Sequence, residues 1–302
     1  MFDLISIGNI SMDMYFKGDS LTYEGDRFTL AIGGKYFVDK FHQGIGGGGA
    51  NVAIGAARHG CRAAVVGKLG NNVFRRIILS DLTDAGVNHS LCSFEEEYLN
   101  ISAILLSPKG ERSIINFDTP HQHIIRDDRD LEPLARARVV YLGNLPDVSF
   151  TEREEITHFL HRRGVPIAVN LGVKDCRRPI DQIEKFLKPV DVILVNSYEY
   201  AELIKKDHKR LDLSASATYR HPMIKDKAVI VTDGANGSFG YADGVIHYQK
   251  AIPVKEIVDT TGAGDGFVSA FLAEYIKSGD MRHAMKEGAY YAAHILQKLG
   301  AN

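Results

Sequence analysis

Short apolar runs alternate with helix-like stretches along most of this 302-residue chain, and this alternation limits the available folds more than any other feature. The apolar runs have the character of strands buried on both faces: DLISIGNI, AAVVGKLG, RVVYLGN, PIAVNLG, DVILVN and KAVIVTDG. The stretches between them have helical periodicity: ANVAIGAARHG, VFRRIILSDLTDAG, TEREEITHFLHRRG, IDQIEKFLKP and SYEYAELIKKD. The alternation predicts an α/β fold with a doubly wound, mostly parallel sheet flanked by helices.

Two further helices are expected to finish the chain. The first begins at about Ala263, and the second has Asp280 as its N-cap. The second helix gathers small and apolar residues on one side: Met281, Ala284, Met285, Gly288, Ala289, Ala292, Ile295, Leu296 and Leu299. That side is expected to face the core.

Two strand-rich segments interrupt the alternation, at about residues 14–45 and 99–118. The first contains RFTLAI and KYFVDKFHQ, and the second contains LNISAILLS and RSIINF, joined by PKGE as a hairpin. Ligands of doubly wound sheets bind beyond the carboxyl ends of the strands, so these insertions are expected to form a small β lid there. A decorative edge sheet is the alternative. With no repeat or linker in view, residues 1–302 are predicted to form a single α/β domain with a lid.

Composition argues against several classes of partner. A formal net charge of -2 gives no reason to expect binding to nucleic acid. No apolar run approaches the ~18 residues of a membrane-spanning helix, and no basic, apolar leader opens the chain, so no membrane partner is expected. The three cysteines, at positions 61, 92 and 176, fit neither a disulfide framework nor a zinc site. The expected compartment is the reducing cytoplasm.

The stretch DTTGAGDGFVSAFL places glycines and an acid directly before a helix. The first turn of a helix has free amide N–H groups and partial positive charge, and Gly262 and Gly264 let a bulky ligand approach the backbone. This is the chemistry of a phosphate or oxyanion site. The same field should keep Asp265 ionised, so that it can accept a proton from a hydroxyl group. The pattern suggests phosphoryl transfer; the alternative is a glycine-rich helix start with Asp as a cap.

The segment DTTGAGDGF resembles the C-terminal signature of the ribokinase-like, or PfkB, carbohydrate kinases. Four other segments resemble motifs of the same family and occur in the family order: GNISMD, GGGGAN with the 36 residues that follow it, NSYE and TDGANG. Any one match is weak or moderate, whereas five in register over nearly the whole chain are specific. The resemblance implies a kinase that uses ATP and Mg²⁺, with a monovalent cation as a further candidate cofactor.

The resemblance also implies roles for individual residues. Asp265 is implied as the catalytic base, and Gly262, Ala263 and Gly264 as the anion hole. Four positions are implied to hold sugar hydroxyls: Asp13, Gly47, Gly48 and Asn51. Four are implied to contact the nucleotide and its phosphates: Asn196, Thr232, Gly234 and Gly237. Glu199 is implied to hold the metal ion through water, since magnesium keeps several waters in protein sites.

Two departures from the family pattern bear on the acceptor. Gly48 stands where kinases of sugar phosphates often carry Lys, which favours an unphosphorylated sugar such as ribose, fructose or ketodeoxygluconate. The stretch AVNLG lacks the D-x-N-x-R pattern of many ribokinases and fructokinases, which leaves the sugar open.

Two alternatives to a sugar kinase stay open. One is a nucleoside kinase in which lid aromatics hold a purine; the candidates are Phe16, Tyr23, Phe28, Tyr36, Phe37 and Phe41. These aromatics fit strand packing equally well. The other is a sensor that binds sugar or nucleotide without turnover. A homodimer through the lid strand edges is also expected, because an exposed edge needs covering.

Overall fold

The computed structural model describes residues 1–24, 27–107, 112–121, 123–125 and 130–302. The PKGE turn predicted at residues 108–111 lies outside the described residues. Within them, no helix is long and apolar enough to cross a membrane.

The central sheet has eight strands among the described residues, in the order β16-β15-β14-β13-β12-β11-β1-β6. Their bounds are Phe2–Ile7 (β1), Ala63–Val66 (β6), Ala137–Leu142 (β11), Ile167–Val169 (β12), Val192–Asn196 (β13), Ala228–Thr232 (β14), Ser238–Ala242 (β15) and Val245–Gln249 (β16). Strands β6 to β14 in this order pair in parallel, and β15 and β16 add an antiparallel edge. The predicted mostly parallel sheet is confirmed.

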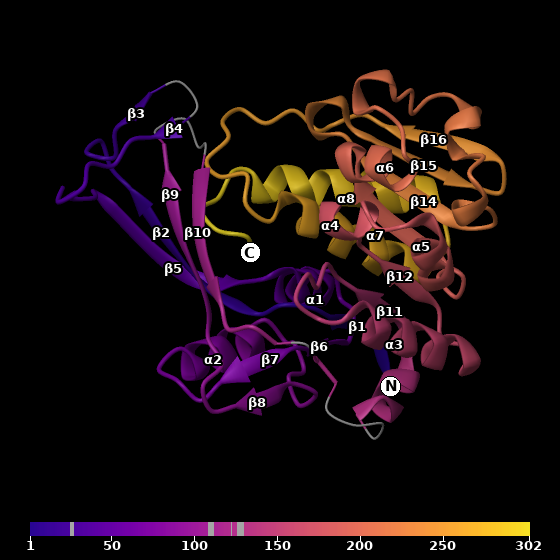
Figure 1. The fold of residues 1–302 in the computed structure, drawn as a ribbon, viewed down its shortest axis with the longest axis horizontal. Helices are drawn as coiled ribbons and strands as arrows, with labels where there is room; N and C mark the ends of the chain where they lie inside the picture. Colours follow the sequence, from indigo (N-terminus) through magenta and orange to yellow (C-terminus); the bar gives the residue numbers. More distant parts are fainter. Residues whose placement is uncertain (25–26, 108–111, 122, 126–129) are drawn as a thin grey trace.

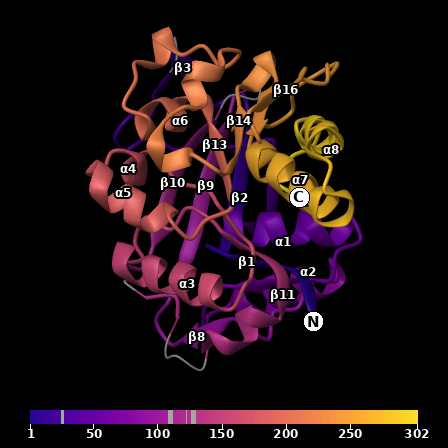
Figure 2. The ribbon, with the colours of Figure 1, turned by 90° about the vertical axis from the view of Figure 1, so that its right-hand side faces the viewer.

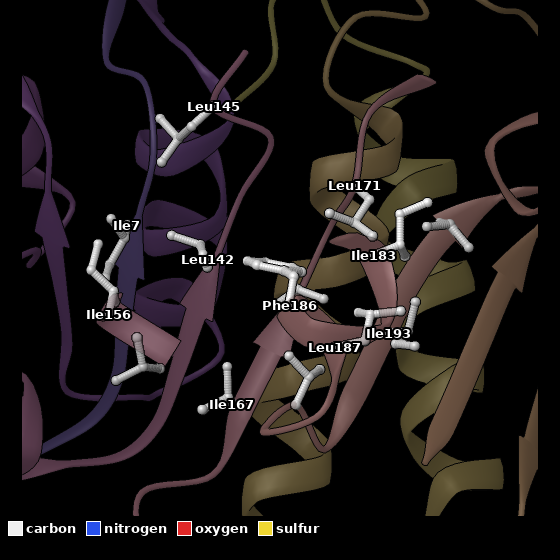
Figure 3. Close-up of a cluster of buried hydrophobic side chains, with 14 of the residues drawn as sticks. Ile7, Leu142, Leu145, Ile156, Ile167, Leu171, Ile183, Phe186, Leu187 and Ile193 are labelled. Carbon is white, nitrogen blue, oxygen red and sulfur yellow. The ribbon is translucent and has the colours of Figure 1, made fainter. Parts of the chain in front are cut away.

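The parallel strands are apolar on both faces because each face carries its own core. Along β1, Ile5 and Ile7 point to one face and belong to one buried cluster, whereas Leu4 points to the opposite face and belongs to the other. Figure 3 shows the first cluster, in which Ile7, Leu142, Ile167 and Ile193 from neighbouring strands meet Phe186 of a covering helix. Continuous apolar runs therefore gave the correct strand positions.

Helices cover both faces of the central sheet (Figures 1 and 2). One face carries α3 (Phe150–Arg162), α4 (Val173–Cys176), α5 (Ile180–Leu187) and α6 (Ser197–Leu203). The other carries α1 (Gly48–Arg58), α7 (Ala263–Ser278) and α8 (Met281–Ile295). Asp280 caps α8 by accepting a hydrogen bond from the amide of His283 at 3.0 Å, as predicted. Helix α2 (Arg75–Asp84) packs instead in a third buried cluster, next to the separate four-stranded sheet described below.

A four-stranded sheet, the lid, stands to one side of the helix-covered body (Figure 1). Its order is β10-β9-β2-β5, with bounds Ser11–Lys17 (β2), Lys40–Gly46 (β5), Asn100–Leu106 (β9) and Arg112–Asp118 (β10). Strand β2 pairs in parallel with β9, and the other two pairings are antiparallel. The predicted lid is confirmed, and the pairing of β9 with β10 agrees with the predicted hairpin.

The structure corrects several boundaries. The lid begins at Ser11 rather than at residue 14, and of RFTLAI only Arg27–Phe28 (β4) is a strand, paired with Tyr23–Glu24 (β3). The run AAVVGKLG breaks after Val66, since Lys68–Gly70 (β7) pairs with Ser93–Glu95 (β8) in a separate small sheet. Local apolar character does not reveal which partner a strand will find.

Candidate active site

The start of α7 is shaped by close backbone packing. Gly262 has the left-handed φ of 76°, and a Cβ at this position would lie 2.4 Å from the Cβ of Ala301. The first backbone hydrogen bond of the helix runs from the amide of Gly266 to the carbonyl of Gly262, so the amides of Ala263, Gly264 and Asp265 precede it. A Cβ on Gly264 would meet no atom within 4 Å. The first turn of α7 therefore has amide groups before its first helical hydrogen bond and open space beside Gly264, the features of an anion site.

A buried carboxylate holds the loop in front of α7. Asp259 is fully buried, and it accepts hydrogen bonds from the amide and hydroxyl of Thr261 at 2.8 and 2.7 Å. Its second oxygen accepts a bond from the amide of Gly300 at 3.1 Å. The loop that carries the glycines is thus fixed from inside and from the far end of the chain.

Asp265 lies in the first turn of α7 and accepts a hydrogen bond from Asn51 Nδ2 at 2.8 Å. Gly48, at the start of α1, is close enough that a Cβ there would be 3.6 Å from the carboxylate. Burial raises the pKa of Asp265, the bond from Asn51 acts in the opposite direction, and the charge of Asp13 raises it further. The helix amides, which favour the ionised form, would lower this pKa, whereas burial raises it.

The glycine run before α1 lets three segments meet at the backbone. At Gly46 an added Cβ would lie 2.0 Å from the carboxylate of Asp13, and at Gly47 it would lie 2.4 Å from the carbonyl oxygen of Asn9. Gly47 also has a positive φ of 88° and serves as the N-cap of α1. The run therefore brings Asp13, Gly48 and Asn51 to the same corner as Asp265.

The lid contributes a row of polar side chains from its inner face. Ser11 donates a hydrogen bond to Asp13 at 2.8 Å, and Ser102 donates one to Asn116 at 3.0 Å. Asp13 pairs in register with Ser102, and Ser102 pairs with Asn116, so the row crosses three strands. Burial raises the pKa of Asp13, while hydrogen bonds from Ser11, Ser102 and Tyr15 lower it. Such a row offers both donors and acceptors to a polyol.

The motif NSYE forms a capping box at the start of α6. Asn196 Oδ1 accepts a bond from the amide of Glu199 at 2.8 Å, and Glu199 Oε2 accepts one from the amide of Asn196 at 2.9 Å. Burial raises the pKa of Glu199, hydrogen bonds from Asn196 and Asn170 lower it, and the charge of Asp265 raises it. The spacing of this motif is therefore required by the helix itself, and one carboxylate oxygen takes no part in the box.

A cavity of about 180 Å³ joins the two halves of the site. From α7 it is lined by Gly264, Asp265, Phe267 and Val268, and from the carboxyl ends of the strands by Tyr141, Asn170, Leu194, Val195, Asn196, Ile230 and Thr232, together with Glu199. A phosphate-sized group in this cavity would lie between the helix amides and Glu199. The position is the one expected for a ligand of a doubly wound sheet.

Gly234 and Gly237, which were predicted to contact the nucleotide, lie next to this cavity rather than in its lining. Gly234 and Gly237 form the turn after β14, both with positive φ. At Gly237 an added Cβ would lie 2.2 Å from the carbonyl oxygen of Gln249, so packing against β16 accounts for this glycine. Thr232, in contrast, lines the cavity directly.

Comparison with known proteins now decides the family. The model of the pfkB family of carbohydrate kinases matches residues 1–302. The chain belongs to this family. Ribokinase of Arabidopsis thaliana is 26% identical over 306 residues, which span 99% of this chain and 77% of the relative. The family resemblance drawn from the five motifs is confirmed, and this pfkB chain is a carbohydrate kinase of an ATP-dependent phosphotransferase family.

Solved structures show the same fold. The structure of Arabidopsis thaliana ribokinase complexed with ribose and ATP matches with a TM-score of 0.79 at 24% identity, covering 99% of this chain and 94% of that chain. A nucleoside kinase of Burkholderia thailandensis in complex with inosine matches with a TM-score of 0.74 at 18% identity, covering 99% and 92%. At these identities the likeness defines the ribokinase-like fold of this pfkB chain and leaves its acceptor open.

Sequence reasoning missed several residues of the site. Ser102 and Asn116 could have been found from strand alternation, because they share the pleat direction of Asp13 once the pairing is known. Tyr141 is 2% exposed and lines the cavity, and it had been assigned only to a strand. Asn302, which contacts Asn51, has no local signal at all, since 251 positions separate the two.

Proposed function

We propose that this kinase transfers the terminal phosphoryl group of ATP to a hydroxymethyl group of an unphosphorylated sugar. The observation that carries the proposal is the shared cavity, in which Gly264 and Asp265 face Asn196, Glu199 and Thr232. A donor nucleotide needs amides and a metal ligand for its phosphates, and an acceptor alcohol needs a base. Both sets of groups line one space.

In the proposed reaction, Asp265 accepts the proton of the acceptor hydroxyl. The hydroxyl oxygen forms a bond to the terminal phosphorus of ATP, the bond from that phosphorus to the bridging oxygen breaks, and ADP leaves. The amides at Gly264 and Asp265 donate to the oxygens of the phosphoryl group as its charge redistributes. The raised pKa of Asp265 suits a general base better than the pKa of an exposed aspartate does.

Glu199 fits the metal ligand that ATP requires. Its carboxylate is fixed by the capping box, lines the cavity, and retains an oxygen that the box does not use. When bound, Mg²⁺ would neutralise phosphate charge, and a single carboxylate with several waters is an ordinary ligand set for it. A monovalent cation stays a prediction.

The acceptor side supports a sugar more than a nucleoside. The row from Asp13 through Ser102 to Asn116 is polar, and Gly48 supplies no cation for a phosphorylated acceptor. Of the six lid aromatics considered for a purine, Phe16 and Phe41 pack together at a ring-centroid distance of 5.4 Å. Each of these two residues is next in sequence to an inward-facing residue of its strand. Because successive side chains of a strand alternate between faces, both lie on the outer face of the lid.

A panel of acceptors tests the proposal. ADP release would be measured with ribose, fructose, ketodeoxygluconate, adenosine and guanosine, with Asp265→Asn as the inactive control. Turnover is expected with at least one sugar. Turnover with a nucleoside alone would replace the sugar by a nucleoside, and tight binding without turnover of any member would favour a sensor.

The homodimer was predicted through the lid strand edges, and the apolar outer face of the two edge strands, β5 and β10, supports it. Phe41, Ile115 and Phe117 are more than half exposed, at 55%, 61% and 54%, and they share this face with Phe16. We therefore propose that a second copy of the chain covers it. Light scattering on the purified protein should give the mass of a dimer, and Phe117→Lys should shift it to the monomer.

A further inference from the structure

The segment Leu299–Asn302 links the lid, the glycine loop and the catalytic corner. Leu299 packs against a buried lid cluster formed by Tyr15, Ile104 and Leu106. The two residues after it contact the loop before α7, Gly300 through Asp259 and Ala301 against Gly262. Figure 1 marks this end of the chain between the lid strands and the body.

The side chain of Asn302 continues this path to Asp265 through one other amide. Asn302 Nδ2 donates to the backbone carbonyl of Ile45 at 3.0 Å and to Asn51 Oδ1 at 2.9 Å. Asn51 Nδ2 in turn donates to Asp265 Oδ2 at 2.8 Å. Two hydrogen bonds therefore run in series from Asn302 through Asn51 to the carboxylate, and the third anchors Asn302 to the backbone.

The carbonyl of Ile45 fixes the direction of the whole series. A backbone carbonyl only accepts hydrogen bonds, so the atom of Asn302 that faces it must be the amide nitrogen. The same nitrogen faces Asn51, and the atom of Asn51 that meets it must be the oxygen. The amide nitrogen of Asn51 is thereby turned toward Asp265. The orientation of Asn51 follows from its partners and is not a free choice between two flipped states.

We propose that Asn302 is a positioning residue that holds the Asn51 amide with its donor toward Asp265 and so favours the ionised carboxylate. Without Asn302, the amide of Asn51 can turn over and present its oxygen. The oxygen of Asn51 would then face an oxygen of Asp265, and the two can form a hydrogen bond only if Asp265 carries a proton. The proposal rests on the proposed function only for its effect on turnover, because the ionisation of Asp265 can be followed without a substrate.

The series also leaves Asn51 suited to an acceptor hydroxyl. An amide has two N–H donors and an oxygen with two lone pairs. One donor goes to Asp265 and one lone pair goes to Asn302. One donor and one lone pair remain, which matches a hydroxyl that accepts one bond and donates another. Asn302 therefore orients the same amide for the acceptor as for the base.

The test is a carboxyl ¹³C NMR titration of Asp265 in the intact protein, with the signal assigned by its loss in Asp265→Asn. In Asn302→Ala the midpoint is expected to rise by about 0.5–1 pH unit, the equivalent of one hydrogen bond to the carboxylate. The charges of Asp13 from β2, Glu199 from α6 and Tyr141 from β11 are also coupled to that of Asp265. Asn302→Ala leaves all three residues in place.

Two controls separate orientation from packing. Gln297→Ala removes an amide from the same end of the chain that, within the described residues, donates to the carbonyl of Ala293 in α8 at 2.9 Å, and it should leave the midpoint unchanged. In an Asn51→Ala background, Asn302→Ala should have no further effect, because the relay is already absent. If Asn302→Ala does not fold, Asn302→Leu keeps a similar side-chain volume, removes both donors without adding a charge, and should raise the midpoint in the same direction.

An unchanged midpoint in Asn302→Ala would overturn the proposal, as would an equal shift with and without Asn51. These outcomes are independent of the acceptor panel. Failure of every acceptor would reject the proposed function while the NMR midpoint still reported on the relay. Conversely, an active enzyme with an unshifted midpoint would reject only the role of Asn302.

Discussion

Two aspartates on opposite faces of the central sheet, Asp175 fully buried and Asp265 half-buried, show how the same side chain serves two purposes. Asp175 of α4 is held by Arg153 of α3 at 2.6 and 2.9 Å and by Arg178 at 3.1 Å. Among the described residues, the side-chain partner of Asp265 in α7 is the neutral amide of Asn51. Burial raises the pKa of both carboxyls, but at Asp175 the two guanidinium groups outweigh burial and the pKa is lowered.

The difference teaches how to separate structural from chemical carboxylates. A buried charge with a cation beside it has its desolvation cost offset, so it can persist for stability or geometry alone. A buried carboxylate without a cation lowers stability, and such groups concentrate at functional sites. Asp265 and Asp13 belong to the second kind, and Asp175 belongs to the first.

The largest effect expected from this comparison is the loss of turnover in Asp265→Asn. Removing the base should lower kcat by ~10²–10⁴-fold. Because the pKa of Asp265 is raised in the folded state, its ionised form costs stability at neutral pH, so the variant should melt about 1–3 °C higher. Steady-state kinetics and thermal unfolding would measure the two effects. A variant that keeps its activity would contradict the assignment of the base.

The next effect is the loss of stability in Asp175→Asn. The substitution leaves Arg153, which is 1% exposed, buried without its full countercharge. Breaking such a pair typically costs about 3–5 kcal/mol in the free energy of unfolding. Urea unfolding would measure this loss. Activity per folded molecule should not change, and a specific loss of kcat in folded Asp175→Asn would show that the comparison is wrong.

The smallest effect concerns pH. The pKa of Asp265 is raised by burial, so kcat/KM should fall as pH drops through a value above that of an exposed aspartate. Asp13 and Glu199, whose pKa values are also raised, contribute to this limb, whereas Tyr141, whose pKa is raised further above its ordinary alkaline value, stays protonated throughout it. Asp175 behaves in the opposite way: its pKa is lowered, so its stabilising effect is present at neutral pH and is lost only as pH falls through that lowered value.

A pH profile of kcat/KM, with thermal unfolding recorded at each pH, would separate the two carboxylates. Activity should decline while the protein is still folded. If activity and folding are lost together, the acidic limb reports unfolding rather than the base.

The sequence was sufficient wherever the pattern is local. Buried parallel strands are continuous apolar runs, and helix starts carry caps such as Asp280, so both could be located from neighbouring residues alone. The missed hairpin of β15 and β16 also has a local signal. Asp243 and Gly244 between these strands have φ values of 50° and 81°, the two positive angles that an Asp-Gly turn supplies.

The remainder depends on partners that are distant in sequence. The lid row needs the parallel pairing of β2 with β9, which no short window contains. The raised pKa of Asp265 needs the burial that the lid and α1 create together. The motif residues were predicted because their chemistry is local, whereas their electrostatic environment is a property of the assembled corner.

The glycines before and at the start of α1 limit the positions at which this enzyme can be engineered. At Gly46 any side chain would overlap Asp13, and at Gly49 it would lie 2.5 Å from the backbone of Gly8. A mutagenesis library at these positions would sample mostly collapsed or misassembled proteins. The tunable positions lie opposite, at Ser102 and Asn116 on the lid strands β9 and β10. Sugar preference should therefore be altered by substituting polar side chains of the lid while the glycines at the start of α1 are kept.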